Sequence, residues 1–381
     1  MTASPFVQHL GRGSAALRHA VTPRAWRGAL RIDLHKAGVA VPLRVGAAVT
    51  LVFVIGGLTG QQDVVGFAAL GALVAAFCRP DPYPVRLGRL VVLGVGITAS
   101  IGVGAGLGVA GSPVVVNVAV ISLLAGAAAC VVAALHILGP GAVIFVFAAV
   151  GAQGFAVDGD DLIRAVAVTA GGAVIGVIAA LAPWFIQLLR RAMTGAADVS
   201  TGPTPAKREA IWTTLSRAPH RTLAMLGARI AVAGALGAAV AVNLGLDHPM
   251  WAAMGAVATM QGVGYHVAIH RGIQRLLGNL GGALLAAGLL ALPLGYWGTV
   301  AAIIVFQTVA EIASTVNYAL TSVAVTPMAL LLTGLGAGLP PEAAIDRVLD
   351  TGVGIVVGIV IAALTISGAD AKQLGSWRRG S

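Results

Sequence analysis

The sequence predicts an all-α polytopic membrane protein with about twelve transmembrane helices, arranged as two parallel repeats of six helices. Three observations lead to this fold class: the composition, the length of the apolar segments, and residues that recur in register in both halves. Of the 381 residues, 58% are hydrophobic and 10% are charged, whereas soluble proteins carry about 25% charged residues. The apolar segments approach the roughly 20 residues with which a helix crosses a bilayer.

The apolar segments fall into two groups of six. The first group is expected near 41–58, 64–78, 90–110, 114–134, 137–156 and 165–187. The second group is expected near 226–246, 249–264, 277–294, 298–312, 318–336 and 348–367. These groups define a cytoplasmic N-terminal segment over 1–40, a first repeat over 41–189, a linker over 190–221, a second repeat over 222–367 and a tail over 368–381.

Basic and acidic residues alternate between successive connections, and this alternation sets the expected orientation. Basic residues gather in the N-terminal segment, around 79–89, in the linker, around 271–275 and in the tail, whereas the intervening connections are acidic. Cytoplasmic loops carry an excess of Lys and Arg. Both termini and the linker are therefore expected in the cytoplasm, with the protein in a bacterial inner membrane. The amphipathic stretches around Trp26 and Trp212 are expected to lie on the inner membrane surface.

Charged residues recur in register between the two halves. The pairs are Arg44 with Arg229, Asp63 with Asp247, and Arg164 with Arg347. Apolar helices resemble one another by chance, but charged residues have no such reason to align. A repeat of six spans leaves both units facing the same way, as in transporters built from parallel repeats.

Charges inside or at the edge of apolar segments are the first candidates for function, because each costs at least about 2.5–3.5 kcal/mol in the membrane. Arg44 and Arg229 either attract an anion between the halves or reach the lipid headgroups. Glu311 and Asp350 are candidates for proton coupling. Asp350 lies one helical turn from Arg347, so a static ion pair is the alternative.

Arg164 and Arg347 stand on the expected outer side and would place positive charge at an outer mouth. The alternative is that Arg164 only pairs with Asp160 or Asp161, and Arg347 with Asp346 or Asp350.

Two prolines interrupt apolar segments at roughly corresponding places. Pro140 lies in the fifth segment and Pro327 in the eleventh. Matching helix breaks in two repeats point to a transporter's binding site, although a tolerated kink in a packed helix is an equal alternative for either proline.

Other patterns predict no enzyme, metal or cofactor site. His266 and His270 have metal spacing but lie in a basic connection without an HExxH motif. The glycines from Gly102 to Gly108 lie mid-membrane with no strand before them, which favours helix packing over phosphate binding. Because the basic residues follow the topology, the net charge of +10 does not indicate nucleic-acid binding.

Three segments of the second half resemble the FUSC family of fusaric-acid-resistance and aromatic-acid-exporter proteins. HRGIQRLLGNLGGALLA (270–286) is similar to its arginine-bearing loop and glycine helix, with Asn279 in place of the usual threonine. NYALTSVAVTPMALLL (317–332) resembles its Asn-Tyr…Thr span, and DRVLDTGVGIVVG (346–358) its final helix. The match is clearest over 220–367 and weaker over 40–187. Many family members carry a large cytoplasmic domain where this chain has a short linker.

The resemblance implies a secondary exporter of organic acids, aromatic carboxylic acids in particular, with proton coupling, or a relative of the plant malate channels. The substrate-binding candidates are Arg44, Arg229, Arg164, Arg347, Tyr318 and Thr326, since a guanidinium group holds a carboxylate bidentately. Three alternatives remain: a passive organic-anion channel, a major-facilitator-like drug exporter and a non-transporting accessory subunit. The expected partners are the lipid bilayer and a small organic anion, without nucleic acid, and a homo-oligomer is compatible with the sequence.

Overall fold

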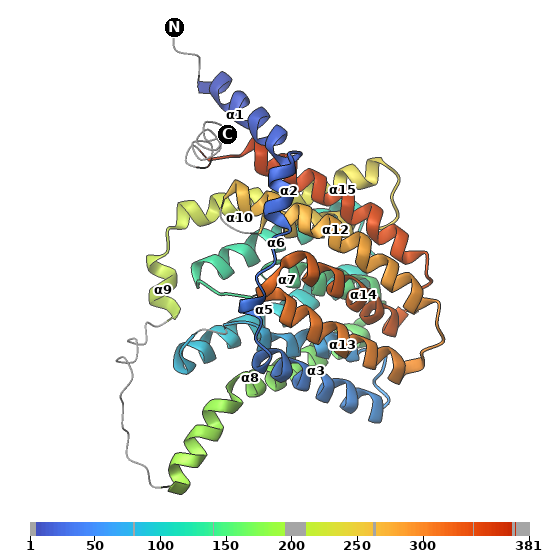
Figure 1. Ribbon diagram of the computed structural model, residues 1–381. Coiled ribbons are helices and arrows are strands. Elements are labelled where there is room, and N and C mark those ends of the chain that lie inside the picture. Colours follow the sequence, from blue (N-terminus) through green and yellow to red (C-terminus); the bar gives the residue numbers. More distant parts are fainter. Residues whose placement is uncertain are drawn as a thin grey trace.

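The computed structural model describes residues 5–78, 81–139, 141–194, 211–261, 264–337, 339–367 and 370, and every regular element in these ranges is a helix (Figure 1). The helices of the first half are α1 (Pro5–Ala20), α2 (Pro23–Ala29), η1 (Leu34–Lys36), α3 (Ala40–Leu58), α4 (Val65–Ala72), η2 (Leu73–Ala76), α5 (Tyr83–Val109), α6 (Val114–Ala134), α7 (Val143–Phe155) and α8 (Gly159–Thr194). Those of the second half are α9 (Ile211–Arg217), α10 (His220–Asn243), α11 (Pro249–Met260), α12 (Tyr265–Leu290), α13 (Gly295–Val316), α14 (Tyr318–Ala337) and α15 (Ala343–Leu364).

Nine helices within the described ranges are long and apolar enough to cross a membrane: α3, α5, α6, α8, α10, α12, α13, α14 and α15. The protein is therefore an all-helical polytopic membrane protein. The segments expected near 64–78, 137–156 and 249–264 form shorter helices instead, namely α4 with η2, α7 and α11. Twelve full-length helices are thus not found in the part of the chain that the structure describes.

Backbone conformation and burial explain the three short helices. The α4–η2 run ends before Cys78, whose φ is +55°, and α7 begins only after Gly139 and Gly141, whose φ angles are +157° and +80°. A right-handed helix does not accommodate such angles. Helix α11 is buried at every position from Met250 to Met260. Irregular backbone at membrane depth is tolerated where protein surrounds it.

Helix α12 begins well before the expected start at residue 277. The sequence around Arg271 and Arg275 was expected to be a loop, but it forms the first turns of α12. Its apolar residues, Ile269 and Ile273, are buried in a cluster with the N-terminal helices α1 and α2. Tertiary packing therefore extends the helix and places both arginines on it.

Equivalent helices make equivalent contacts in the two halves. Helix α4 packs on α8 as α11 packs on α15, and α5 packs on α7 as α12 packs on α14. Glycines allow the close approach: Gly172 faces the carbonyl of Ala68, and Gly354 faces the carbonyl of Ala252. The halves also exchange contacts, because α6 packs on α10 and α13 packs on α3.

The N-terminal segment, formed by α1, α2 and η1, is attached to the second half. Helix α1 packs on α15, α2 packs on α12, and η1 contacts α13. The side-chain amide of Asn317, between α13 and α14, donates to the carbonyls of Ala29 (3.1 Å) and Arg31 (2.9 Å). Gln274 on α12 donates to the Ala29 carbonyl at 2.6 Å. Helices α1 and α2 and the 3-10 helix η1 are thereby held against the second half.

Candidate functional site

A cavity of about 380 Å³ is lined by three arginines, and we call it the arginine cavity. Its polar lining includes Arg271, Arg275, Gln307, Glu311, Tyr318 and Arg347. Its apolar wall includes Leu70, Val143, Phe147, Met254, Val325 and Met328. Helices α12 to α15 thus supply the polar side, whereas α4, α7, α11 and part of α14 supply the apolar side.

The two arginines of α12 surround the ring of Tyr318. They lie one helical turn apart, so both project from the same face. Arg275 is 8% exposed, and its Nη1 donates to the Tyr318 hydroxyl at 3.1 Å. The guanidinium carbon of Arg271 lies 5.6 Å from the centroid of the same ring, a cation–π arrangement. Tyr318 therefore fixes the position of both cations at the wall of the cavity.

The third arginine approaches from α15. Arg347 is 5% exposed, and its guanidinium carbon lies 4.9 Å from the centroid of the Trp251 ring. Its Nε is buried without a hydrogen-bond partner, as is the Nε of Arg275. An unsatisfied donor on a buried cation is costly. Both side chains therefore have hydrogen-bonding capacity to offer to a ligand.

No carboxylate neutralises these three cations directly. Among the described residues, none of Arg271, Arg275 and Arg347 forms an ion pair within 4.0 Å. Glu311 is 7% exposed and accepts a hydrogen bond from Gln307 Nε2 at 3.1 Å. The described lining thus carries three positive charges against one negative charge, and its composition suits an anion.

Asp350 does not pair with Arg347, in contrast to the static ion pair considered from the sequence. The Asp350 side chain is 1% exposed, and its Oδ2 lies 4.0 Å from Nδ1 of His248. The His248 ring stacks on Trp251, with centroids 4.3 Å apart and planes 12° apart. Trp251 therefore contacts both His248 and Arg347.

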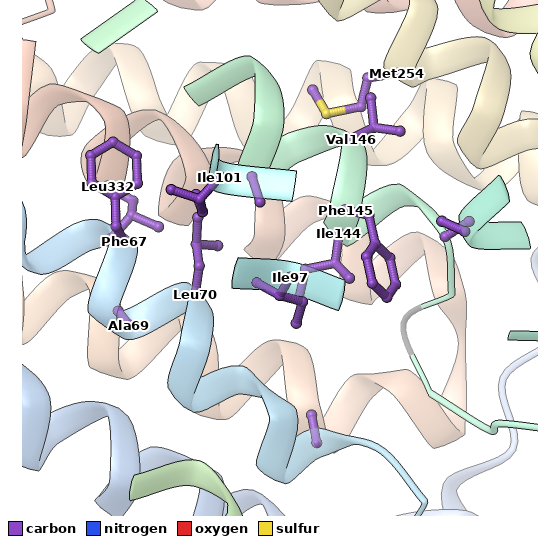
Figure 2. Packing of buried hydrophobic residues seen from close by; sticks show 14 of the residues in the cluster. Phe67, Ala69, Leu70, Ile97, Ile101, Ile144, Phe145, Val146, Met254 and Leu332 are labelled. Atoms are coloured by element: carbon purple, nitrogen blue, oxygen red, sulfur yellow. The ribbon is translucent and has the colours of Figure 1, made fainter. Parts of the chain in front are cut away.

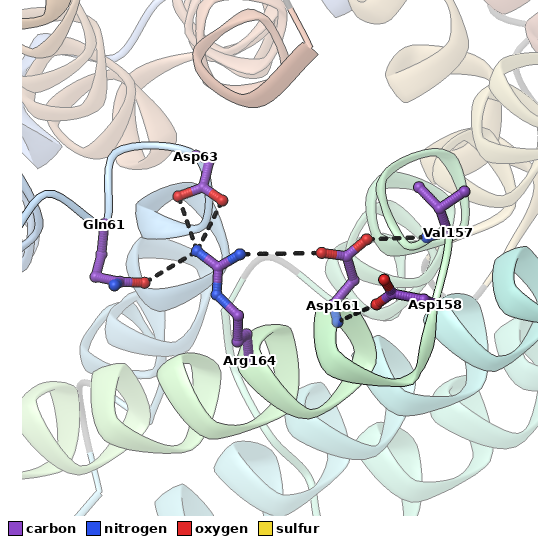
Figure 3. Close-up of polar contacts among 6 residues, drawn as sticks. All are labelled: Gln61, Asp63, Val157, Asp158, Asp161 and Arg164. Carbon is purple, nitrogen blue, oxygen red and sulfur yellow. Dashed lines mark hydrogen bonds and ion pairs between the residues drawn. The ribbon is translucent and has the colours of Figure 1, made fainter.

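Arg164 occupies a different environment from Arg347. It pairs with Asp63 at 2.8 Å and also donates to Gln61 at 3.1 Å, as Figure 3 shows. Asp161 is further away, at 3.9 Å, so the partner expected from the sequence is secondary. The Arg164 side chain is 40% exposed, and such pairs contribute about 0–1 kcal/mol.

Helix packing explains why the two arginines differ. Gly71 of α4 faces the carbonyl of Thr169, and Gly255 of α11 faces the carbonyl of Thr351. In these contacts Thr351 takes the place of Thr169, an offset of 182 residues. The sequence alignment of Arg164 with Arg347 has an offset of 183 residues, which is one more. One residue rotates a helix face by about 100°. Arg347 consequently lies inside, whereas Arg164 lies at the surface.

The other sequence candidates lie outside the arginine cavity. Arg44 donates from Nε to the carbonyl of Ala40 at 3.4 Å, and Arg229 is half-buried on α10. Thr326 is buried and donates to the carbonyl of Ser322 at 2.9 Å. Pro327 lies inside α14. Pro140 lies outside the described residues.

Sequence reasoning missed Arg271, Arg275 and Gln307 as site residues. The two arginines were assigned to a basic connection, although their spacing within HRGIQRLLGN is that of one helix face. The described residues also contain no group of three or more His, Cys, Asp or Glu side chains arranged for a metal ion.

Comparisons with known proteins give one match, to a protein family. No curated protein and no solved structure matches the chain. Residues 230–361 match the family described as fusaric acid resistance protein-like, a range that contains Arg271, Arg275, Glu311 and Arg347. Together with the nine long apolar helices, this match indicates a multi-pass, transporter-like membrane protein. The match agrees with the resemblance to the FUSC family that the motifs of the second half indicated.

Proposed function

We propose that this protein is a secondary transporter that exports organic acids, aromatic carboxylates in particular, across the bacterial inner membrane. One observation carries the proposal: Arg271, Arg275 and Arg347 line one cavity, and no carboxylate of the described ranges pairs directly with them. An anion that leaves water for such a site loses its hydration, and buried guanidinium groups replace it with charge-assisted hydrogen bonds.

The apolar wall indicates the kind of anion. Ligand pockets commonly span about 300–1,000 Å³, so a cavity of about 380 Å³ suits a small molecule. Phe147, Met254 and Met328 contribute apolar surface to the same cavity. A carboxylate attached to an aromatic or aliphatic body would satisfy both sides, because methionine and aromatic side chains pack well on rings.

We assign proton coupling to Asp350. Glu311, the second carboxylate considered for coupling, lines the arginine cavity and accepts a hydrogen bond from Gln307. Asp350 is buried, and its Oδ1 has no hydrogen-bond partner. Its Oδ2 lies 4.0 Å from Nδ1 of the partly exposed His248. A proton would therefore reach Asp350 from the His248 side, while the anion occupies the Arg347 side. Trp251, which contacts both His248 and Arg347, would couple protonation of Asp350 to anion binding at Arg347.

The same proposal includes two parallel units with both termini in the cytoplasm. The matched contacts of α4 with α8 and of α11 with α15 support it, as do α5 with α7 and α12 with α14. The first unit then comprises four membrane-crossing helices with the short helices α4 and α7, and the second comprises five with the short helix α11. The basic connections support the cytoplasmic placement of the ends.

The test is uptake of radiolabelled benzoate and of aliphatic acids into inverted vesicles that contain the purified protein, with and without an imposed pH gradient. We expect gradient-dependent uptake, with loss of uptake in Arg275→Gln. Arg164→Gln is the matched control, because Arg164 lies outside the cavity and at the surface. Equal loss in both variants, or no uptake of any acid by the native protein, would overturn the proposal. Uptake that never exceeds equilibrium would support the passive channel instead.

A further inference from the structure

A second cavity lies at the other end of helices α4, α7, α11 and α14. This aromatic cavity has a volume of about 400 Å³, and its lining includes Phe67, Asn117, Gln153, Phe155, His248 and Trp251. It lies by the acidic connections, since Asp63 and Asp247 also line it. Its described lining contains no Lys or Arg, in contrast to the three cations of the arginine cavity.

The two cavities share a wall. Leu70 of α4 and Phe147 of α7 line both of them. Four helices also run from one cavity to the other, because α4, α7, α11 and α14 each contribute residues to both linings. These are the short helix of each half and the α7–α14 pair, so the two cavities lie in line between equivalent elements.

An apolar layer closes the passage between the cavities. We define the central plug as Leu70, Phe147, Met254 and Leu332. Leu70 is 4% exposed, Met254 1% and Leu332 7%, and Figure 2 shows these three side chains in the packed core. Met254 lines only the arginine cavity, and Leu332 lines only the aromatic cavity. A continuous apolar constriction excludes water and ions by dewetting.

One contact between a charged and an aromatic side chain connects the linings of the two cavities. Arg347 lines the arginine cavity and Trp251 lines the aromatic cavity, and their side chains touch across a cation–π contact of 4.9 Å. An anion bound by Arg347 is thus already next to the wall of the second cavity.

We propose that the two cavities are the two ends of one translocation path and that the central plug is its gate, with Phe147 as the side chain that must move. This inference rests on the proposed function, since it describes the route of the same anion. The backbone around Phe147 can accommodate the movement. Helix α7 starts after the positive-φ glycines Gly139 and Gly141, and α14 contains Pro327, which removes one helical hydrogen bond.

The charge difference between the cavities gives the path a direction. The arginine cavity attracts an anion, whereas the aromatic cavity offers rings, amides and two carboxylates, one of which is paired with Arg164. An anion that passes the plug loses its cationic partners and is released. The arginine cavity is therefore the loading site and the aromatic cavity the release site.

The test is thiol accessibility, which needs no transported substrate and so can succeed or fail separately from the uptake assay. The two native cysteines, Cys78 and Cys130, are first replaced by Ala. Ser314→Cys then reports on the arginine cavity and Gln153→Cys on the aromatic cavity, since each lines only one of them. Sealed vesicles of either orientation are treated with 2-sulfonatoethyl methanethiosulfonate, a membrane-impermeant anion.

With an intact plug, we expect each cysteine to react from one face only, and the two from opposite faces. Adding Phe147→Ala should allow both cysteines to react from both faces. Phe145→Ala is the matched control, because Phe145 lies on the same helix, is buried (5% exposed) and lines neither cavity. Sidedness should persist in that control.

Two results would overturn the inference: reaction of both cysteines from the same face before the plug is altered, or unchanged sidedness in Phe147→Ala. If Phe147→Ala does not yield folded protein, as judged by size-exclusion chromatography, Leu70→Ala opens the same wall and the same expectations apply. Loss of sidedness in the Phe145→Ala control would also count against a gate at Phe147.

Discussion

At the scale of single residues, aromatic side chains hold two of the buried arginines. Arg275 donates to a phenol hydroxyl and Arg347 lies over an indole ring, and neither pairs with a carboxylate in the part of the chain that the structure describes. Such neighbours hold a cation in place without cancelling its charge. A carboxylate partner would compete with an anionic substrate, so the use of Tyr318 and Trp251 keeps the site available.

Replacing Arg275 by lysine tests whether geometry or charge alone matters. Lysine keeps the charge but lacks the planar fork that can hold Tyr318 and a carboxylate together. We expect Arg275→Lys to weaken benzoate binding about tenfold, or ~1.4 kcal/mol, as measured by isothermal titration calorimetry in detergent. The control is Arg89→Lys, whose guanidinium pairs with Asp81 at 2.8 Å outside the cavity. Unchanged affinity in Arg275→Lys would show that the charge alone suffices.

Asp350 supports a second residue-scale prediction. In Asp350→Asn we expect gradient-driven accumulation of the acid to stop while downhill flux persists, because the amide cannot carry the proton but leaves Arg347 and the cavity in place. Flux is measured in proteoliposomes with and without a pH gradient. Asp346→Asn, one turn away on α15 and not among the cavity-lining residues, is the control. Normal accumulation in Asp350→Asn would rule the coupling role out.

At the scale of helices, small residues determine how the bundle packs. The backbones of α4 and α8 approach closely because Gly172 faces the Ala68 carbonyl, with no room for a Cβ atom between them. Helix pairs in membranes gain their stability from such close contact, since lipid is as apolar as the side chains themselves. The adjacent Gly171 has nothing within 4 Å of an added Cβ atom.

These neighbouring glycines form a matched pair for a stability measurement. Gly172→Ala should lower the unfolding temperature in detergent by several degrees, because overpacking costs about 1–3 kcal/mol. Gly171→Ala should leave it unchanged or raise it, since alanine is about 1 kcal/mol better than glycine inside a helix. Thermal unfolding followed by circular dichroism distinguishes the two. Equal effects would show that α4 and α8 are not in close contact.

Helices also show where sequence reasoning succeeds and where it stops. The nine long helices were predicted because lipid imposes uniform apolar length on whatever it touches. Helices α4, α7 and α11 are surrounded by protein, which does not require that length, so hydropathy marks them as full spans incorrectly. The expected start of helix α12 was placed too late for the opposite reason, because its cavity-lining arginines made its first turns look like a polar connection.

The same reasoning applies to the site. Arg347, Glu311 and Tyr318 were candidates from the sequence and all line the arginine cavity, since a charge or a motif inside an apolar segment is visible without a structure. Arg271 and Arg275 were not, because a charge beside an expected loop resembles an ordinary topology signal. Arg347 is buried and Arg164 is not because the two helices differ by one residue in how they pack. A sequence alignment of two apolar helices does not determine that register.

At the scale of the whole molecule, charge distribution and helix pairing lead to the same expected layout. The ends and the linker are basic, and the connections near the aromatic cavity carry Asp63 and Asp247. We expect a green fluorescent protein fused after Ser381 to be fluorescent, and alkaline phosphatase inserted after Asp63 or Asp247 to be active. An active phosphatase at the C-terminus would invert the layout and exchange the loading and release ends of the path.

The attachment of the N-terminal segment has a consequence for biosynthesis. The first forty residues leave the ribosome first, yet Gln274 and Asn317, which hold the carbonyls of Ala29 and Arg31, are synthesised late. Helix α3 likewise waits for α13, and α6 waits for α10. Because chains begin to fold while they are still being made, the α6 face waits until α10 is synthesised, and the α3 face waits until α13 is synthesised. The contacts of α3 and of the N-terminal segment are therefore completed only after synthesis has passed Asn317.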